Sequence, residues 1–120
     1  MLFRSFNALK IRAQCNVKSG RAEDAVTDYR RALEISPADR SARVGLALAL
    51  RGNGKNEEAM VVLNSIQGES DGWDVRFGRA MVLDAMGRRE HAKEEAKIAL
   101  EMNPGNSLVQ GFARKLGLKP

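Results

Sequence analysis

The sequence predicts an all-α fold, an array of three antiparallel helix-turn-helix repeats followed by a C-terminal capping helix. The first observation is a phrase that occurs three times, as Gly-Arg-Ala-Glu-Asp-Ala, Gly-Lys-Asn-Glu-Glu-Ala and Gly-Arg-Arg-Glu-His-Ala. The second is the period, because the glycines that begin these phrases stand 34 and 33 residues apart, a spacing typical of stacked helical repeats. The period predicts repeats at about 6–39, 40–72 and 73–106 and a capping helix at about 107–117, within a single domain of residues 1–120.

Each repeat begins with an amphipathic helix that ends at the glycine of the phrase. Apolar residues recur there at spacings of three and four, as Leu46, Ala47 and Leu50 do in the second repeat, and this spacing gives a helix one buried face. The glycines Gly20, Gly54 and Gly87 are the turns, because glycine adopts the left-handed conformation that ends many helices.

The second helix of each repeat begins with acidic residues, such as Glu23, Glu57 and Glu90, which suit the positive end of a helix dipole. Small or apolar residues then return at fixed positions, where they let neighbouring helices approach closely. The expected packing residues of the second helices are Ala25, Ala59, Ala92, Ala32, Ile66 and Ala99.

Helix breakers separate the repeats. The segments 36–39 (Ser-Pro-Ala-Asp) and 103–106 (Asn-Pro-Gly-Asn) end a second helix and supply a capping residue for the next helix. Between the second and third repeats the segment 68–72 (Gly-Glu-Ser-Asp-Gly) takes the place of the proline. We expect Asp71 and Asp74 to form a weak capping box there, and we expect the array to flex at this segment.

Residues at both ends of the chain are expected to cover the ends of the array. Leu108, Phe112 and Leu116 stand at four-residue spacing, which predicts a capping helix, with a detached partner-binding motif as the alternative. At the other end, Leu2, Phe3 and Phe6 either cap the first repeat or pack against further repeats.

The net charge of +5 raises the question of nucleic-acid binding. Seven basic and five acidic residues stand in 1–39, the two kinds balance in 40–106, and three basic residues stand in 107–120. A nucleic-acid interface more often gathers basic residues in one stripe with aromatic residues between them, so we expect none. No apolar stretch approaches the roughly 18 residues of a membrane span, and we expect no membrane binding. The single Cys15 excludes an internal disulfide and favours a reducing compartment, which with the absence of a leader pattern predicts a cytoplasmic location.

No catalytic constellation is visible, and we expect no enzyme activity, cofactor or metal. The segment 52–55 (Gly-Asn-Gly-Lys) lacks the first glycine and the hydroxyl residue of a phosphate-binding loop. His91 and Glu95 are expected to form a solvated pair on an exposed helix rather than a metal site. Cys15 has no nearby base to activate it and is expected to be a half-buried packing residue.

The register resembles that of the tetratricopeptide repeat (TPR) family over about residues 6–106. The resemblance rests on the three turn glycines, on Tyr29, on Pro37 and Pro104, and on small residues at Ala13, Ala47 and Ala80 and in the second helices. It implies a right-handed solenoid. Two positions depart from the family. The large aromatic residue of the first helix is replaced by Leu9, Arg43 and Arg76, and the leucine three residues later by Arg12 and Arg79. We expect the stems of these arginines to pack with their charges in solvent, or else the arginines to mark a contact surface.

The resemblance further implies that the first helices line a concave groove that binds a peptide or helix. The candidate groove residues are Lys10, Gln14, Val44, Leu48, Arg51, Phe77, Met81 and Asp84, flanked by Asn7, Val17, Ser41 and Asp74. The centre of this surface is apolar and its rim is mixed in charge, so we expect an apolar or amphipathic segment to bind with about micromolar affinity. The alternative is that some of these residues only pack between neighbouring first helices.

One subtype of the family holds the C-terminal carboxylate of chaperone tails with lysines, an arginine and asparagines at fixed groove positions. Those positions hold Lys10, Gln14, Gly45, Asp74 and Gly78 in this sequence. A single lysine is retained and Asp74 repels an acidic tail, so we expect no binding of chaperone tails.

The expected function is that of a non-catalytic protein-interaction adaptor or scaffold. One alternative is a homo-oligomerisation module that uses the ends of the array. The other is a regulatory fragment of a larger enzyme or assembly complex.

Overall fold

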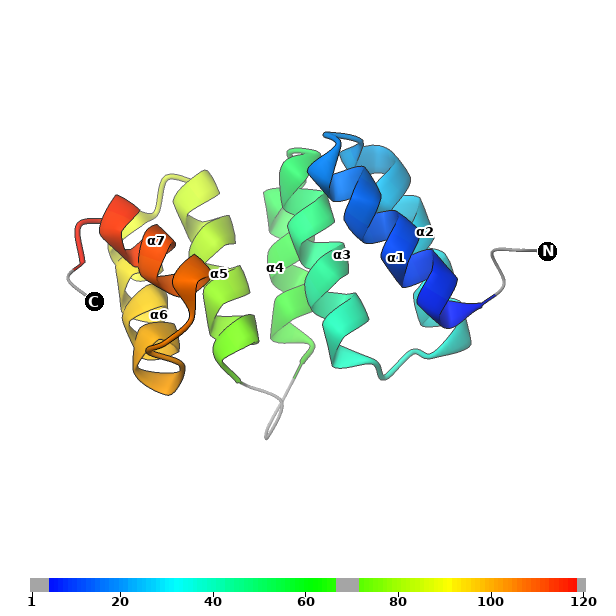
Figure 1. Ribbon diagram of the computed structural model, residues 1–120. Coiled ribbons are helices and arrows are strands. Elements are labelled where there is room, and N and C mark those ends of the chain that lie inside the picture. Colours follow the sequence, from blue (N-terminus) through cyan, green and yellow to red (C-terminus); the bar gives the residue numbers. More distant parts are fainter. Residues whose placement is uncertain (1–4, 67–71, 119–120) are drawn as a thin grey trace. The chain divides into compact units, whose positions relative to one another are not determined.

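The computed structural model describes residues 5–66 and 72–118, and in these two ranges the regular structure is entirely α-helical (Figure 1). The predicted all-α fold is confirmed. The chain divides into two compact units, residues 1–65 and 66–120, and the division lies beside the predicted hinge at 68–72. Residues 67–71, which include Asp71 and all of that segment except Gly72, lie outside the described part of the chain, as do Leu2 and Phe3.

Each unit is built from helices that pack against their neighbours in sequence. Unit 1 contains α1 (Phe6–Lys18), α2 (Ala22–Ile35), α3 (Arg40–Gly52) and α4 (Asn56–Asn64). Unit 2 contains α5 (Trp73–Ala85), α6 (Arg89–Met102) and α7 (Ser107–Lys115). In unit 1, α2 packs against both α1 and α3, and in unit 2, α6 packs against both α5 and α7. The first helices of the three repeats are therefore α1, α3 and α5, and the second helices are α2, α4 and α6.

The phrase glycines form the predicted turns. Gly20, Gly54 and Gly87 have φ angles of 78°, 78° and 81°, in the left-handed region that favours glycine. The residue after each glycine donates its backbone N–H to a carbonyl near the end of the first helix; in the first repeat Arg21 N–H bonds Asn16 O at 2.7 Å. This is the Schellman arrangement that satisfies the last carbonyls of a helix.

The predicted capping residues begin the helices that follow the breakers. The Asp39 carboxylate accepts a hydrogen bond from Ala42 N–H at 2.8 Å, and the Asn106 side chain accepts from Leu108 N–H at 2.9 Å. The Asp74 carboxylate accepts a hydrogen bond from Val75 N–H at 3.0 Å. Asp74 is the second residue of α5, and the N-cap residue of this helix is Gly72. The second helices have no side-chain cap and instead have acidic residues in the first turn, which the helix dipole favours.

The expected packing residues are buried. The alanines at the small-residue positions of first and second helices are 0% exposed, and Ile66 is 5% exposed. Tyr29, the aromatic residue expected in α2, is 4% exposed and its ring lies on Gly45 of α3. A Cβ atom at Gly45 would come within 2.6 Å of two ring carbons and the hydroxyl oxygen of Tyr29, so this junction requires glycine.

At the junction between α6 and α7 the large side chain belongs to the later helix, whereas at the α2–α3 junction it belongs to the earlier one. Ala96 of α6 occupies the register position of Tyr29, nine residues after the turn glycine, and Phe112 of α7 occupies that of Gly45, six residues after the capping residue. Ala96 is 0% exposed, and the Phe112 ring packs against Phe77. The register positions of the two junctions thus pair a large residue with a small one in both cases, as dense packing favours.

The prediction for the buried face of the last helix was wrong at Leu108, and Phe112 is only partly buried. Leu108 is 68% exposed, and the buried residues are Val109, Ala113 and Leu116. These three stand at the same distances from Asn106 as Ala42, Leu46 and Ala49 stand from Asp39, and the latter are among the buried residues of α3. The helix therefore follows the register of a first helix, in which the position of Leu108 is solvent-exposed.

Candidate binding surface

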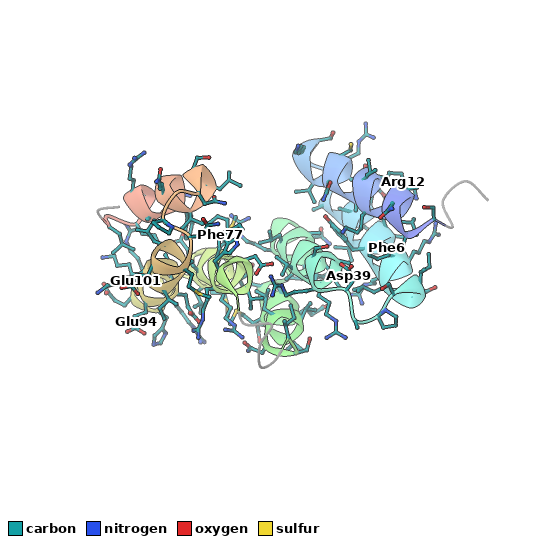
Figure 2. All side chains as sticks on the ribbon, turned by 60° about the horizontal axis from the view of Figure 1, so that its bottom comes forward. Phe6, Arg12, Asp39, Phe77, Glu94 and Glu101 are labelled. Atoms are coloured by element: carbon teal, nitrogen blue, oxygen red, sulfur yellow. The ribbon has the colours of Figure 1, made fainter. Side chains whose placement is uncertain are left out.

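The candidate groove residue Lys10 is held within unit 1. Its ammonium donates to Ser41 Oγ at 2.6 Å, lies 3.9 Å from Asp39 Oδ1, and stands 5.2 Å above the centroid of the Phe6 ring. Figure 2 labels Phe6 on α1 and Asp39 at the start of α3. Burial alone would raise the pKa of Asp39, but hydrogen bonds from Ala42 and Ser41 and the charge of Lys10 lower that pKa below its usual value. Lys10 therefore joins α1 to the start of α3.

The remaining candidates in unit 1 differ in exposure. Gln14 of α1 is exposed, whereas Val44, Leu48 and Arg51 of α3 are partly buried. The flanking residue Ser41 is exposed and donates its hydroxyl to Asp39 Oδ1 at 2.8 Å. The apolar side chains of Val44 and Leu48 on α3 are thus partly accessible to solvent.

The candidates in unit 2 include an aromatic residue that packs within the unit. The Phe77 ring meets the Phe112 ring edge to face with centroids 5.7 Å apart, and it meets the Trp73 ring at 6.3 Å. Figure 2 shows Phe77 on α5, toward α7. Met81 and Asp84 are partly buried. Phe77 therefore supports the contact between α5 and α7, and a role in binding has to be compatible with that contact.

An ion pair that the sequence reasoning missed joins the two helices of the first repeat. Asp28 of α2 is 2% exposed, and Arg12 of α1 donates to its two carboxylate oxygens from Nε at 2.8 Å and from Nη2 at 2.6 Å. Asn16 Nδ2 donates to the same carboxylate at 3.1 Å. The hydrogen bond to Asp28 is the main cause that raises the pKa of Arg12. The Arg12 charge thus meets a buried carboxylate rather than reaching solvent as expected.

A second such pair lies in the third repeat. Arg76 Nη1 donates to Glu95 Oε2 at 2.8 Å, and Arg79 Nη1 lies 3.8 Å from Glu95 Oε1. The expectation of a solvated pair between His91 and Glu95 was therefore wrong, because Glu95 faces the arginines of α5 and its side chain is 17% exposed. Both arginines that replace the family's leucine meet a carboxylate of the second helix.

The distances of these residues from the turn glycines could have predicted the ion pairs from the sequence. Arg12 and Asp28 stand eight residues before and eight residues after Gly20, and Arg79 and Glu95 stand at the same distances from Gly87. In the second repeat these two positions hold Leu46 and Val62. Residues at equal distances from the turn of a helical hairpin lie across from each other, so opposite charges at both positions predict a pair.

Two exposed residues of α1 were also missed. Ile11 is 61% exposed, and Cys15 is exposed rather than half-buried as expected. The equivalent positions in α3 are Gly45 and Ala49, and Ala49 is 0% exposed. The difference arises because α2 covers this face of α3, whereas no described element of unit 1 covers it on α1.

In the described ranges, histidine, cysteine, aspartate and glutamate form no group of three or more that could hold a metal ion. Among the described helices none is both long and apolar enough to cross a membrane.

A family model described as tetratricopeptide repeat matches residues 16–71. The search of curated proteins found no match. Solved structures are similar over most of the chain. The first TPR domain of human RPAP3 is 20% identical with a TM-score of 0.79, and the similarity covers 93% of this chain and 89% of that one.

Two further solved structures contain bound peptides. The second TPR domain of human RPAP3, in complex with the HSP70 peptide SGPTIEEVD, is 22% identical with a TM-score of 0.72, covering 96% of this chain and 100% of that one. The Yersinia enterocolitica type III secretion chaperone SycD, in complex with a peptide of the translocator YopD, is 17% identical with a TM-score of 0.73, covering 92% and 86%. At these identities the similarity establishes the fold.

Proposed function

We propose, from the premise that this chain belongs to the tetratricopeptide repeat family, that it is a non-catalytic adaptor whose first helices bind a peptide or helix of a partner protein. The observation that carries the proposal is the partial exposure of apolar side chains on successive first helices, namely Val44 and Leu48 on α3 and Met81 on α5. Burial of such a side chain contributes roughly 1.5–3 kcal/mol. A few of them can therefore anchor an apolar or amphipathic segment.

The peptide complexes of the similar TPR domains support this reading. The RPAP3 and SycD structures each have a peptide bound, and their fold is that of this chain. In the present chain Lys10 is bonded to Ser41 and Asp39, and Phe77 is packed against Phe112. We therefore assign the anchoring role to Val44 and Leu48 in unit 1 and to Met81 in unit 2, with Gln14 and Asp84 as the polar contacts of their respective units.

Alanine substitution of the anchors tests the proposal. A peptide is first selected for binding to the full chain from a displayed random library. Leu48→Ala and Met81→Ala should each weaken its binding about tenfold, as expected for the loss of one apolar anchor, when affinity is measured by fluorescence anisotropy.

Val61→Ala is the matched control, because Val61 is a 70% exposed apolar residue on the second helix α4. It should leave the affinity unchanged. If all three substitutions leave the affinity unchanged while the thermal unfolding profiles coincide with the parent, the first helices are not the binding surface.

The chain should not bind chaperone tails. Among the positions that the clamp requires, Gly45 lies beneath Tyr29 and Gly78 is buried, so neither offers a side chain to a carboxylate. Asp74 adds a negative charge that repels acidic tails. A calorimetric titration with the peptide SRMEEVD, which the first TPR of Spaghetti (RPAP3) binds as an HSP90 peptide, should show no heat of binding. Tight, salt-sensitive binding would contradict this prediction.

A further inference from the structure

One face of α1 is open within the described residues of unit 1. We call it the front face, and it consists of Ala8, Ile11, Arg12, Cys15 and Asn16. Ile11 is 61% exposed and Cys15 is exposed. The equivalent residues of α3 are Ala42, Gly45, Leu46, Ala49 and Leu50, and apart from Gly45 each is at most 5% exposed. On α3 this face is covered by α2.

A polar hollow of about 320 Å³ adjoins the front face between α1 and α2. It is lined by Arg12, Asn16, Asp24, Thr27 and Asp28. The lining includes the Arg12–Asp28 pair, in which Asp28 is buried, and Asp24, which is exposed. In the second repeat, apolar Leu46 and Leu50 stand where the first repeat has Arg12 and Asn16. The front face is therefore partly polar where the α2–α3 junction is apolar.

The junction between α2 and α3 in unit 1 shows what a helix that covers such a face contacts. Arg30 of α2 lies 3.5 Å from Glu58 of α4, and Tyr29 of α2 lies on Gly45 of α3. Asp24 is the register equivalent of Glu58, four residues after its turn glycine, and Ile11 is the equivalent of Gly45. A helix on the front face would thus place a cation at Asp24, and beside it a residue small enough to lie over Ile11.

We propose that the front face and Asp24 bind an amphipathic helix of a partner protein that carries a small residue followed directly by a basic residue. Charge complementarity assigns the basic residue to Asp24, as Arg30 is assigned to Glu58 at the α2–α3 junction. The partner residue that lies over Ile11 has to be small, because Ile11 is bulky where α3 has Gly45. The Arg12–Asp28 pair and Asn16 keep the surface partly polar, which suits a helix that associates and dissociates rather than a permanent repeat junction.

A second copy of this chain does not offer that helix from α6. Ala96 and Lys97 of α6 stand at the positions of Tyr29 and Arg30 and have the required chemistry. However, Ala96 is 0% exposed and α6 packs against α7. Displacing α7 would expose its buried side chains Val109 and Leu116, so we assign the front face to a different protein.

The test uses the full chain and a labelled peptide of residues 21–37 with Tyr29→Ala, which has a small residue directly before Arg30. Fluorescence anisotropy should give a dissociation constant of about 100 µM, because the peptide must fold as it binds. Asp24→Lys in the chain should weaken binding about tenfold, and a second peptide with Arg30→Glu should recover that loss against the Asp24→Lys chain. Saturating peptide should slow the alkylation of Cys15 by N-ethylmaleimide, since Cys15 lies in the front face.

Glu23→Lys is the matched control, because Glu23 is exposed in the same first turn of α2 but does not line the hollow. It should leave the affinity unchanged. Absence of binding at millimolar peptide, equal weakening by both lysine substitutions, or unchanged alkylation of Cys15 would each overturn the proposal. Sedimentation that shows self-association of the chain, abolished by Asp24→Lys, would also overturn it and assign the front face to a second copy.

Discussion

In the first and third repeats, charged side chains lie between the two helices of the repeat. The same positions hold apolar residues in the second repeat. Arg12 meets the buried carboxylate of Asp28, and Arg79 lies near Glu95, each at equal distances from a turn glycine. Removal of one partner of a buried pair leaves a charge uncompensated, whereas replacement of both by apolar residues of similar size is often neutral or stabilising. The second repeat, with Leu46 and Val62 at these positions, provides the natural replacement.

Substitution of the first pair by the residues of the second repeat tests this account. Arg12→Leu should destabilise the chain more than Asp28→Val, because it leaves a buried carboxylate while the latter leaves an arginine that can reach solvent. The double variant should be more stable than either single variant. Urea unfolding at pH 7 measures the three free energies, and additive losses would show that the two side chains do not interact.

The Asp39 cap should make stability depend on pH in the acid range. The lowered pKa of Asp39 means that its charged form is favoured in the folded state. This contribution is present above the unfolded value of about 3.9 and is lost as the pH falls through the lower folded pKa. Asp39→Asn keeps a capping side chain, so its deficit relative to the parent in urea unfolding should be present at pH 7 and shrink as the pH falls below the unfolded pKa of Asp39.

The control for the cap is Asp39→Ala. It removes the hydrogen bond to Ala42 at every pH and should cost about 1 kcal/mol. A deficit of Asp39→Asn that is the same at pH 7 and pH 3 would contradict the assignment of the lowered pKa to the folded state.

At the scale of helices, the sequence predicted what depends on local chemistry. The turns at Gly20, Gly54 and Gly87 and the cap at Asp39 follow from the preferences of single residues, and each was found where expected. The buried face of α7 was misplaced because Leu108 and Val109 are both apolar neighbours, and spacing alone does not choose between them. The helix register relative to Asn106 makes that choice.

The junction between α2 and α3 depends on glycine at one position. Gly45→Ala places a Cβ atom 2.4 Å from Tyr29 Cζ in a ring that is 4% exposed, so overpacking should lower the stability by about 1–3 kcal/mol. Shortening the opposing side chain in the double variant Gly45→Ala/Tyr29→Leu should recover part of the loss. Thermal unfolding monitored by circular dichroism measures both.

Gly111→Ala is the control for the junction, because Gly111 is also helical and its Cβ would meet nothing within 4 Å. It should raise the stability by roughly 0.5–1 kcal/mol through helix propensity. A loss of stability at Gly111 as large as that at Gly45 would show that contact with Tyr29 is not the cause.

At the scale of the molecule, the sequence defined the repeats but not which surfaces have neighbours. Cys15 and Ile11 follow the register of residues that lie beneath α2 on α3, so periodicity alone predicted a packing role for Cys15. Lys10 and Phe77 have the spacing of groove residues but contact Ser41 and Phe112. Such contacts depend on side chains far away in the sequence, which a single-helix pattern does not contain.

The central claim is that the first helices form the partner-binding surface, and chemical-shift mapping tests it most directly. The isotope-labelled full chain is titrated with the peptide selected for binding, and amide shifts are followed residue by residue. The account predicts that the largest changes fall on α3 and α5, around Leu48 and Met81, and that they are absent in the variants Leu48→Ala and Met81→Ala at the same peptide concentration. Changes confined to the second helices α2, α4 and α6 would contradict it.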